Sequence, residues 1–99
     1  MQNTAACDED KVLELRVQGR SFAGIAKTLG LRRPSQANDA FNSALRRKPP
    51  AERDALRGRE LARLDTLADA VRARPEVGAD GVARRLRTVA RLRAMLMAE

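Results

Sequence analysis

Two neighbouring segments of the chain carry apolar residues at helical intervals of three and four positions. In the first segment these residues are Phe22, Ile25, Ala26 and Leu29, and in the second they are Ala37, Phe41, Ala44 and Leu45. Gly30 lies between the segments and can adopt the positive φ that ends a helix, while Pro34 suits the first turn of the next one. The pattern therefore predicts two short helices, 22–29 and 34–47, that meet at a tight corner.

The rest of the chain shows helical patterns and no strand pattern, because period-2 alternation and β-branched or aromatic runs are missing. A helix over 10–18 ends at Gly19, and Ser21 occupies the N-cap position of the 22–29 helix. Further predicted elements are a long amphipathic helix over 51–73, a loop over 74–81 that contains Pro75 and two glycines, and a last helix from Gly81 to Ala98.

The sequence thus predicts an all-α protein of three parts, with Pro49 and Pro50 as the boundary between the last two. These parts are a flexible leader over 1–9, a three-helix domain over 10–48, and an antiparallel helical hairpin over 51–98. Nine apolar residues mark the hairpin face expected to bring copies together: Leu56, Leu64, Leu67, Val71, Val82, Leu86, Val89, Leu92 and Leu96. A chain of 99 residues has a modest core, so oligomerisation would supplement its stability.

The positive charge of the chain is concentrated in one segment. The formal net charge is +7, and the segments carry −3 over 1–14, +7 over 15–48, +1 over 49–75 and +2 over 76–99. An abundance of Arg and Ala also follows from a GC-rich genome, but codon bias acts on the whole chain and does not explain this concentration. A local field of this sign favours a polyanion such as DNA. The five arginines of the last helix spread around it, which favours a solvated role: Arg84, Arg85, Arg87, Arg91 and Arg93.

Several function classes lack the residues they need. Cys7 has no second cysteine to pair with, and the absence of histidine removes the common zinc and iron ligands and the usual general base. We therefore expect that the protein has no enzymatic activity and binds no metal and no cofactor. No apolar run approaches the roughly 20 residues that span a bilayer, and the acidic N-terminus does not resemble a signal peptide. These features predict a cytoplasmic protein, associated with the nucleoid if it binds DNA.

The 34–47 helix carries polar side chains opposite its apolar side, as a rotation of about 100° per residue indicates. This polar set consists of Ser35, Asp39, Asn42, Ser43 and Arg46, with Gln36 at its edge. Gln and Asn can hydrogen-bond adenine in the major groove and Arg can bind guanine, whereas a carboxylate opposes DNA unless it accepts from cytosine or pairs with an arginine. Basic residues at the ends of the helix suit phosphates better: Arg32, Arg33, Arg46, Arg47 and Lys48.

These segments resemble known DNA-binding proteins. The string SFAGIAKTLG, followed by a Pro-Ser step and QANDAFNSALRR, resembles the helix-turn-helix of actinobacterial and phage DNA-binding proteins, including small terminase subunits and relatives of region 4 of bacterial sigma factors. The strings RELARLDTLADAVRARPEV and RRLRTVARLRAML resemble the hairpin that follows this motif in small terminase subunits and related phage-derived regulators. The resemblance covers about residues 12–97. It implies that the hairpin mediates self-association and that the third helix recognises DNA through Gln36, Asp39, Asn42, Ser43 and Arg46.

Three functions fit these patterns. The first is a homodimer or higher oligomer that binds double-stranded DNA as a transcription regulator or nucleoid-type factor. The second is a packaging adaptor that binds a phage DNA start site and recruits a larger motor subunit, and a neighbouring gene for a large ATPase would favour it. The third is an interaction module without DNA, whose apolar hairpin docks on an acidic partner protein.

Overall fold

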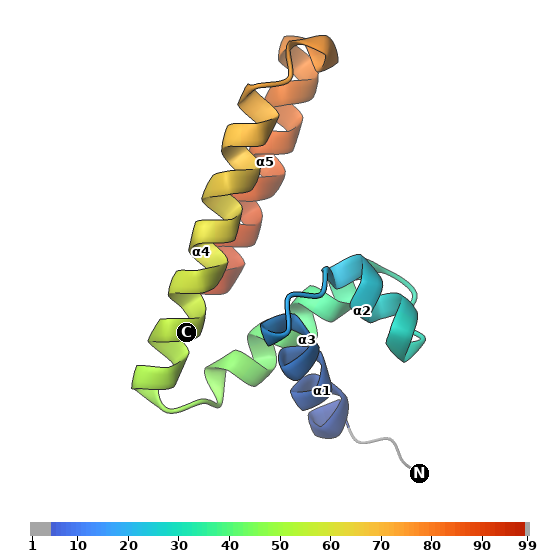
Figure 1. Ribbon diagram of the computed structural model, residues 1–99, viewed down its shortest axis with the longest axis vertical. Helices are drawn as coiled ribbons and strands as arrows, with labels where there is room; N and C mark the ends of the chain where they lie inside the picture. The colour runs from blue at the N-terminus through green and yellow to red at the C-terminus, as the bar shows by residue number, and fades with distance from the viewer. Residues whose placement is uncertain (1–4, 99) are drawn as a thin grey trace. The chain divides into compact units, whose positions relative to one another are not determined.

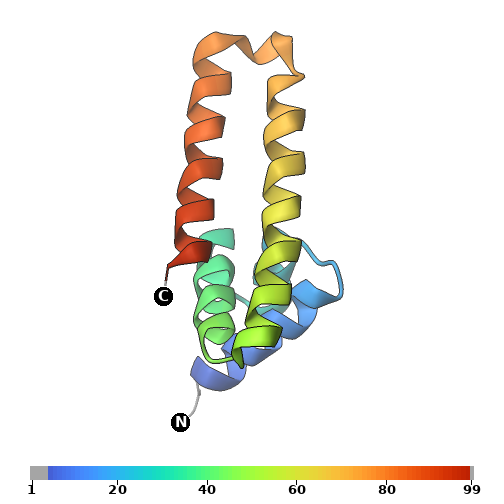
Figure 2. The same ribbon diagram turned by 90° about the vertical axis from the view of Figure 1, so that its left-hand side faces the viewer.

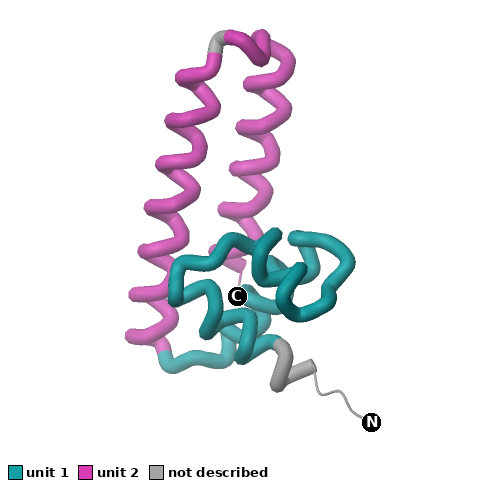
Figure 3. Tube along the Cα trace, turned by 45° about the vertical axis from the view of Figure 1, so that its right-hand side comes forward, with its two compact units in different colours: residues 1–49 teal, residues 50–99 magenta. Residues whose placement is uncertain are grey.

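The computed structural model of the chain describes the backbone of residues 5–98 and the side chains of residues 9–74 and 76–98. This part of the chain is all-α, as predicted, and contains no strand. Its elements are α1 (Ala5–Val17), α2 (Phe22–Leu29), α3 (Pro34–Arg46), α4 (Pro50–Arg72), the 3-10 turn η1 (Pro75–Val77) and α5 (Gly78–Met97) (Figure 1). They belong to two compact units, unit 1 over residues 1–49 and unit 2 over residues 50–99 (Figure 3).

Unit 1 is built around α3, which packs against both α1 and α2. The largest fully buried side chains of the described residues all come from these three helices: Val12, Ile25, Phe41 and Leu45. The ring of Phe22 meets the ring of Phe41 edge to face, with centroids 5.7 Å apart and planes inclined by 65°. Aromatic pairs favour this geometry, so the two phenylalanines belong to the core, as their positions in the sequence predict.

Local signals in the sequence set the corner between α2 and α3. The Ser21 hydroxyl accepts a hydrogen bond from the Gly24 amide at 3.0 Å, which caps the start of α2. Gly30 ends α2 with a φ of 74°, and the Leu31 amide donates to the Ala26 carbonyl at 2.8 Å. Pro34 is the first residue of α3. The predicted bounds of α2 and the predicted start of α3 are therefore confirmed.

The first helix begins earlier than its prediction. The periodic pattern indicated residues 10–18, but α1 runs over Ala5–Val17 and so includes residues assigned to the leader. Alanine favours helix strongly, and acidic residues stabilise a helix near its N-terminus. The first turns of α1 therefore form without the apolar periodicity that marks the rest of it. The leader prediction for residues 1–4 and the side chain of Cys7 lie outside the described residues.

Unit 2 is an antiparallel hairpin of α4 and α5 (Figure 2). Four apolar side chains are buried in it: Ala68, Val71, Val89 and Leu96. The buried Arg57 side chain joins the start of α4 to the end of α5, because its Nε donates to the Leu96 carbonyl at 3.0 Å and its Nη2 donates to the Ala98 carbonyl at 3.1 Å. These carbonyls belong to the helix end that lacks intrahelical donors.

The connection between the long helices is shorter than the predicted loop over 74–81. After η1, helix α5 begins at Gly78, so Gly81 lies inside a helix rather than before one. A Cβ at Gly81 would stand 3.3 Å from the Cβ of Val77. Gly81 therefore allows the Val77 side chain to lie close to the backbone of α5, and it does not end the helix.

The nine apolar residues expected at the hairpin face differ in burial. Three are buried, namely Val71, Val89 and Leu96. Five are partly buried, namely Leu56, Leu64, Val82, Leu86 and Leu92. Leu67 is the most exposed of the set, with 46% of its surface accessible. Across the described residues, no helix combines the length and apolarity required to cross a bilayer.

Candidate nucleic-acid interface

The ten residues predicted to bind DNA cluster on α3 and its two ends. Seven of them are exposed, namely Arg32, Arg33, Ser35, Gln36, Asp39, Arg46 and Arg47. Ser43 and Lys48 are partly buried, and Asn42 is buried. Helix α3 thus presents polar groups along one side and basic groups beside both ends.

Asn42 is the exception to the predicted polar face. Only 3% of its surface is accessible, and the neighbouring Asn38 is accessible to 9%. Because α3 packs against α1 and α2 at once, the buried sector of this helix is wider than the apolar stripe that marks it in the sequence. The Asn42 Oδ1 atom has no hydrogen-bond partner among the described residues. The prediction that Asn42 lies on the exposed side of α3 is therefore wrong.

Gln36 caps the helix on which it was predicted to contact DNA. Its Oε1 atom accepts hydrogen bonds from the amides of Arg32, at 2.7 Å, and Arg33, at 3.1 Å. An arginine side chain has no acceptor, so the Gln36 carbonyl oxygen satisfies the donors in front of α3. The Gln36 amide group keeps its two N–H donors for a ligand. Gln36 therefore stabilises the corner through its oxygen and lies on the exposed face of α3.

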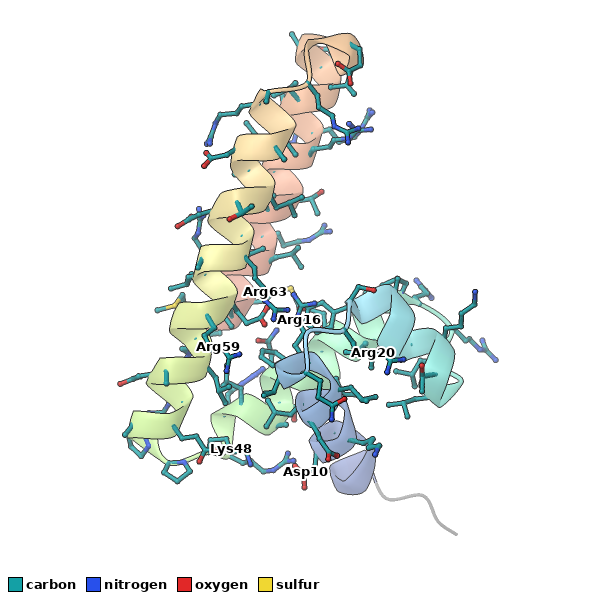
Figure 4. The ribbon with its side chains drawn as sticks, viewed as in Figure 1. Asp10, Arg16, Arg20, Lys48, Arg59 and Arg63 are labelled. Carbon is teal, nitrogen blue, oxygen red and sulfur yellow. The ribbon has the colours of Figure 1, made fainter. Side chains whose placement is uncertain are left out.

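Arg47 is engaged by acidic side chains of α1. Its guanidinium lies 2.5 Å from Glu9 Oε1 and 3.2 Å from Asp10 Oδ1. The hydrogen bond to Glu9, and the smaller contributions of the Glu9 and Asp10 charges and the Asp10 hydrogen bond, raise the pKa of Arg47 despite some desolvation. Figure 4 labels Asp10 and Lys48 at this end of unit 1. Phosphate would compete with two carboxylates for Arg47, which makes Arg46 the stronger candidate.

Two arginines outside the predicted set are fixed beside α2. The Arg16 guanidinium lies 4.0 Å from the centroid of the Phe22 ring, and its Nη1 donates to the Arg20 carbonyl at 2.9 Å. Arg20 Nη2 donates to Thr28 Oγ1 at 2.9 Å, which holds the exposed Arg20 side chain against α2 (Figure 4). Arg20 lies in the turn between two helices, where no periodicity assigns it to a face.

Lys27 joins Arg32 at a hollow beside the corner. The other residues that line the hollow are Ala23, Gly24, Ala26, Leu31 and Pro34. Lys27 and Arg32 are both exposed, so the hollow has an apolar floor and a positive edge. Apart from Arg47, which pairs with Glu9 and Asp10, the exposed basic residues around α2 and α3 are thus Arg20, Lys27, Arg32, Arg33 and Arg46. Within residues 15–48 the only carboxylate is that of Asp39.

Comparison of the chain with protein-family models, curated proteins and solved structures gave no match. Among the described residues, no three His, Cys, Asp or Glu side chains gather as metal ligands. The chemistry and arrangement of the chain's own residues are therefore the basis for assigning a function.

Proposed function

We propose that the chain is a helix-turn-helix protein that binds double-stranded DNA, with α3 as the recognition helix in the major groove. The observation that carries the proposal is the corner at Gly30, after which α3 presents a row of hydrogen-bonding side chains: the exposed Ser35, Gln36, Asp39 and Arg46 and the partly buried Ser43. In this class of motif the first helix crosses the DNA backbone while the second lies in the major groove. The resemblance of residues 21–47 to bacterial and phage helix-turn-helix segments supports the same function.

The charged residues divide into two roles in this proposal. Arg20, Lys27, Arg32 and Arg33 flank the corner and would bind phosphates, which fixes the orientation of α3. Arg46 and the Gln36 amide group would donate to base edges, and Asp39 would accept from cytosine. Because the Asp39 carboxylate otherwise repels the duplex, its exposure favours a specific site over uniform binding to any sequence.

The salt dependence of binding tests the phosphate contacts. Affinity of the full chain for a labelled duplex, measured by fluorescence anisotropy, should fall steeply between about 50 and 200 mM salt because bound counterions are released. Replacing Arg32 and Arg33 together with alanine should weaken binding and reduce the slope of log affinity against log salt by about 2. The matched control replaces Arg72 and Arg87 of unit 2 with alanine and should leave this slope unchanged. Absent or salt-independent binding would contradict the proposal.

Selection of sites from random duplexes tests the base contacts. Arg46→Ala should change which sequences are selected, because a good contact to a base edge discriminates by about 1–3 kcal/mol. Arg33→Ala is the control, since a phosphate contact should lower affinity for all duplexes to a similar extent. Equal losses on selected and random duplexes in Arg46→Ala would show that Arg46 does not read bases.

Self-association is part of the proposal, because helix-turn-helix dimers bind two half-sites one helical turn apart. One side of the hairpin supports it with the partly buried Leu61, Val82 and Leu86 and with Met97, which is 49% exposed. Leu86→Asp should lower the molar mass measured by light scattering, since it puts a charge on this apolar side. A wild type that is already monomeric would remove the assembly from the proposal.

The biological role divides between regulation and packaging. We favour a transcription regulator or nucleoid-type factor, while the resemblance of the hairpin to that of small terminase subunits supports a packaging adaptor as the second candidate. Chromatin immunoprecipitation with sequencing would separate discrete sites, expected for a regulator, from the broad coverage expected for a nucleoid protein. Binding confined to a phage DNA start site would favour the adaptor.

A further inference from the structure

One side of the hairpin in unit 2 bears an open apolar groove. Leu67 and Val71 of α4 line it together with Arg85, Thr88 and Val89 of α5. Leu67 is 46% exposed, whereas Val71 and Val89 lie at the buried seam, with 7% and 4% of their surfaces accessible. Two helices cover only the faces they turn toward each other, so Leu67 stays accessible on the flank of the hairpin, while Val71 and Val89 form the base of the groove.

The α5 side of this groove carries arginines. Arg85 lines it directly, Arg84 lies four residues before Thr88, and Arg91 lies three residues after Thr88. Residues three and four apart share one side of a helix, so Arg84 and Arg91 lie on the side of α5 that carries Thr88. Each of them is exposed, and the single carboxylate of α5 is that of Asp80.

The α4 carboxylates nearest to Leu67 do not neutralise this border, and one of them, Asp69, pairs with Arg72 at 3.3 Å. Asp65 lies two residues before Leu67, a rotation of roughly 200° around the helix, and it pairs with Arg93 at 2.6 Å on the other side of the hairpin. Glu60 lies on the same line of α4 as Leu67, but it is buried and lies 3.9 Å from Arg63. The groove therefore combines an apolar floor with a positive edge.

We propose that this groove binds an amphipathic, acidic helix of another protein, a function separate from DNA binding by unit 1. Apolar side chains of the partner helix would cover Leu67, Val71 and Val89, and its carboxylates would pair with the arginines of α5. A second copy of the chain fits less well, because it would bring the arginines of two α5 helices together. Duplex DNA fits less well because an apolar floor offers no hydrogen bonds to phosphates or bases.

A designed peptide pair tests the chemistry of the groove. The probe is a fluorescent helical peptide with leucines at positions i, i+4 and i+7 and glutamates on both sides of them, and its match carries lysines in place of the glutamates. Anisotropy with the full chain should show binding of the acidic peptide and at least tenfold weaker binding of the basic one. No binding of the acidic peptide, or equal binding of both, would overturn the proposal.

Variants locate the peptide on the groove. Arg84→Glu with Arg85→Glu should lower the affinity for the acidic peptide at least tenfold, and Leu67→Asp should do the same. The matched control, Arg59→Glu with Arg72→Glu, makes an equal charge change at exposed positions of α4 that do not line the groove and should lower the affinity less than threefold. If Leu67→Asp unfolds the hairpin by circular dichroism, the arginine pair decides alone.

Two other outcomes would overturn the proposal in favour of another occupant. A dimeric wild type that becomes monomeric on Leu67→Asp, with no gain or loss of peptide binding, would assign the groove to a second copy. A loss of duplex affinity in the Arg84 and Arg85 variant, with peptide binding unchanged, would assign it to DNA. Neither result depends on Arg32 and Arg33, so failure of this proposal is distinguishable from failure of DNA binding by unit 1.

Discussion

Unit 1 and unit 2 bury their apolar residues to different extents, although they are of nearly equal length. Three helices surround the core of unit 1, in which Val12, Ile25 and Leu45 have no accessible surface. In unit 2 the buried apolar set is small and consists of Ala68, Val71, Val89 and Leu96. Its other buried residues include the charged side chains of Arg57 and Glu60.

The difference follows from the number of helices in each unit. A helix in a bundle of three is covered on two sides, whereas each helix of a hairpin is covered on one. Apolar side chains beside the hairpin seam, such as Leu67, therefore stay accessible to a ligand or a second chain. Unit 1 exposes polar groups outside a closed core, while unit 2 exposes apolar side chains on the flanks that its two helices leave uncovered.

Truncation of a core side chain in each unit should give the largest contrast. Phe41→Ala should lower the free energy of unfolding of unit 1 by about 3–5 kcal/mol, because the site is closed on all sides. Leu67→Ala should cost about 1 kcal/mol or less, because half of the side chain is already in water. Hydrogen exchange resolved by segment should show faster exchange in α1–α3 for the first variant. Equal costs at the two sites would refute the difference between the cores.

Removal of the Arg57 side chain should affect the open end of the hairpin. Arg57→Ala leaves the Leu96 and Ala98 carbonyls without this donor, which should cost about 1–3 kcal/mol. Exchange should rise in the last turns of α5, while unit 1 stays protected. Arg59→Ala, at an exposed position on the same helix, is the control. An equal effect of the two variants would show that these hydrogen bonds do not stabilise the hairpin.

Removal of the α2 cap should have a smaller effect, confined to unit 1. Ser21→Ala loses the acceptor of the Gly24 amide and should lower the free energy of unfolding by about 1 kcal/mol. Ser35→Ala is the matched control, because Ser35 is exposed in the first turn of α3 and is not its N-cap. Chemical denaturation of both variants measures the difference. A larger loss in Ser35→Ala would contradict the capping role of Ser21.

Replacement of the buried Asn42 should have the smallest effect. Asn42→Leu removes an amide oxygen that lacks a partner among the described residues, so stability should change by about 1 kcal/mol or less in either direction. Sequence preference in duplex selection should stay the same, in contrast to Arg46→Ala. A changed preference with unchanged stability would return Asn42 to the set of base-contacting residues.

Short-range patterns were sufficient to predict α2 and the corner. Ser21, Gly30 and Pro34 act through their own backbone geometry and hydrogen bonds with near neighbours, so their sequence positions predict the helix ends directly. The start of α1 was missed because residues 5–9 lack a periodic apolar pattern. The first turn of α5 was missed because Gly81 was interpreted as a breaker, whereas its contact with Val77 depends on packing.

Features that depend on packing between helices could not be predicted from the sequence. The burial of Asn42 follows from contacts of α3 with two helices, and a rotation angle does not show how wide the covered sector is. In the sequence, Arg57 is one of many charged residues in an arginine-rich helix. Its hydrogen bonds to the end of α5 follow only from the packing of the two helices. The groove was missed for the same reason, because Arg84, Arg85 and Arg91 gather on one side only relative to Leu67 on the facing helix. DNA binding remains a prediction.

The hydrogen bonds of Arg57 also determine how unit 2 should respond to a pulling force. Helices α4 and α5 are joined covalently at η1, and Arg57 fastens the opposite end by holding the Leu96 and Ala98 carbonyls. A force that pulls residue 50 away from residue 98 would load these two bonds before the seam at Val89 and Val71. Opening of the hairpin under tension would therefore begin at Arg57 and proceed toward η1, one helical turn at a time.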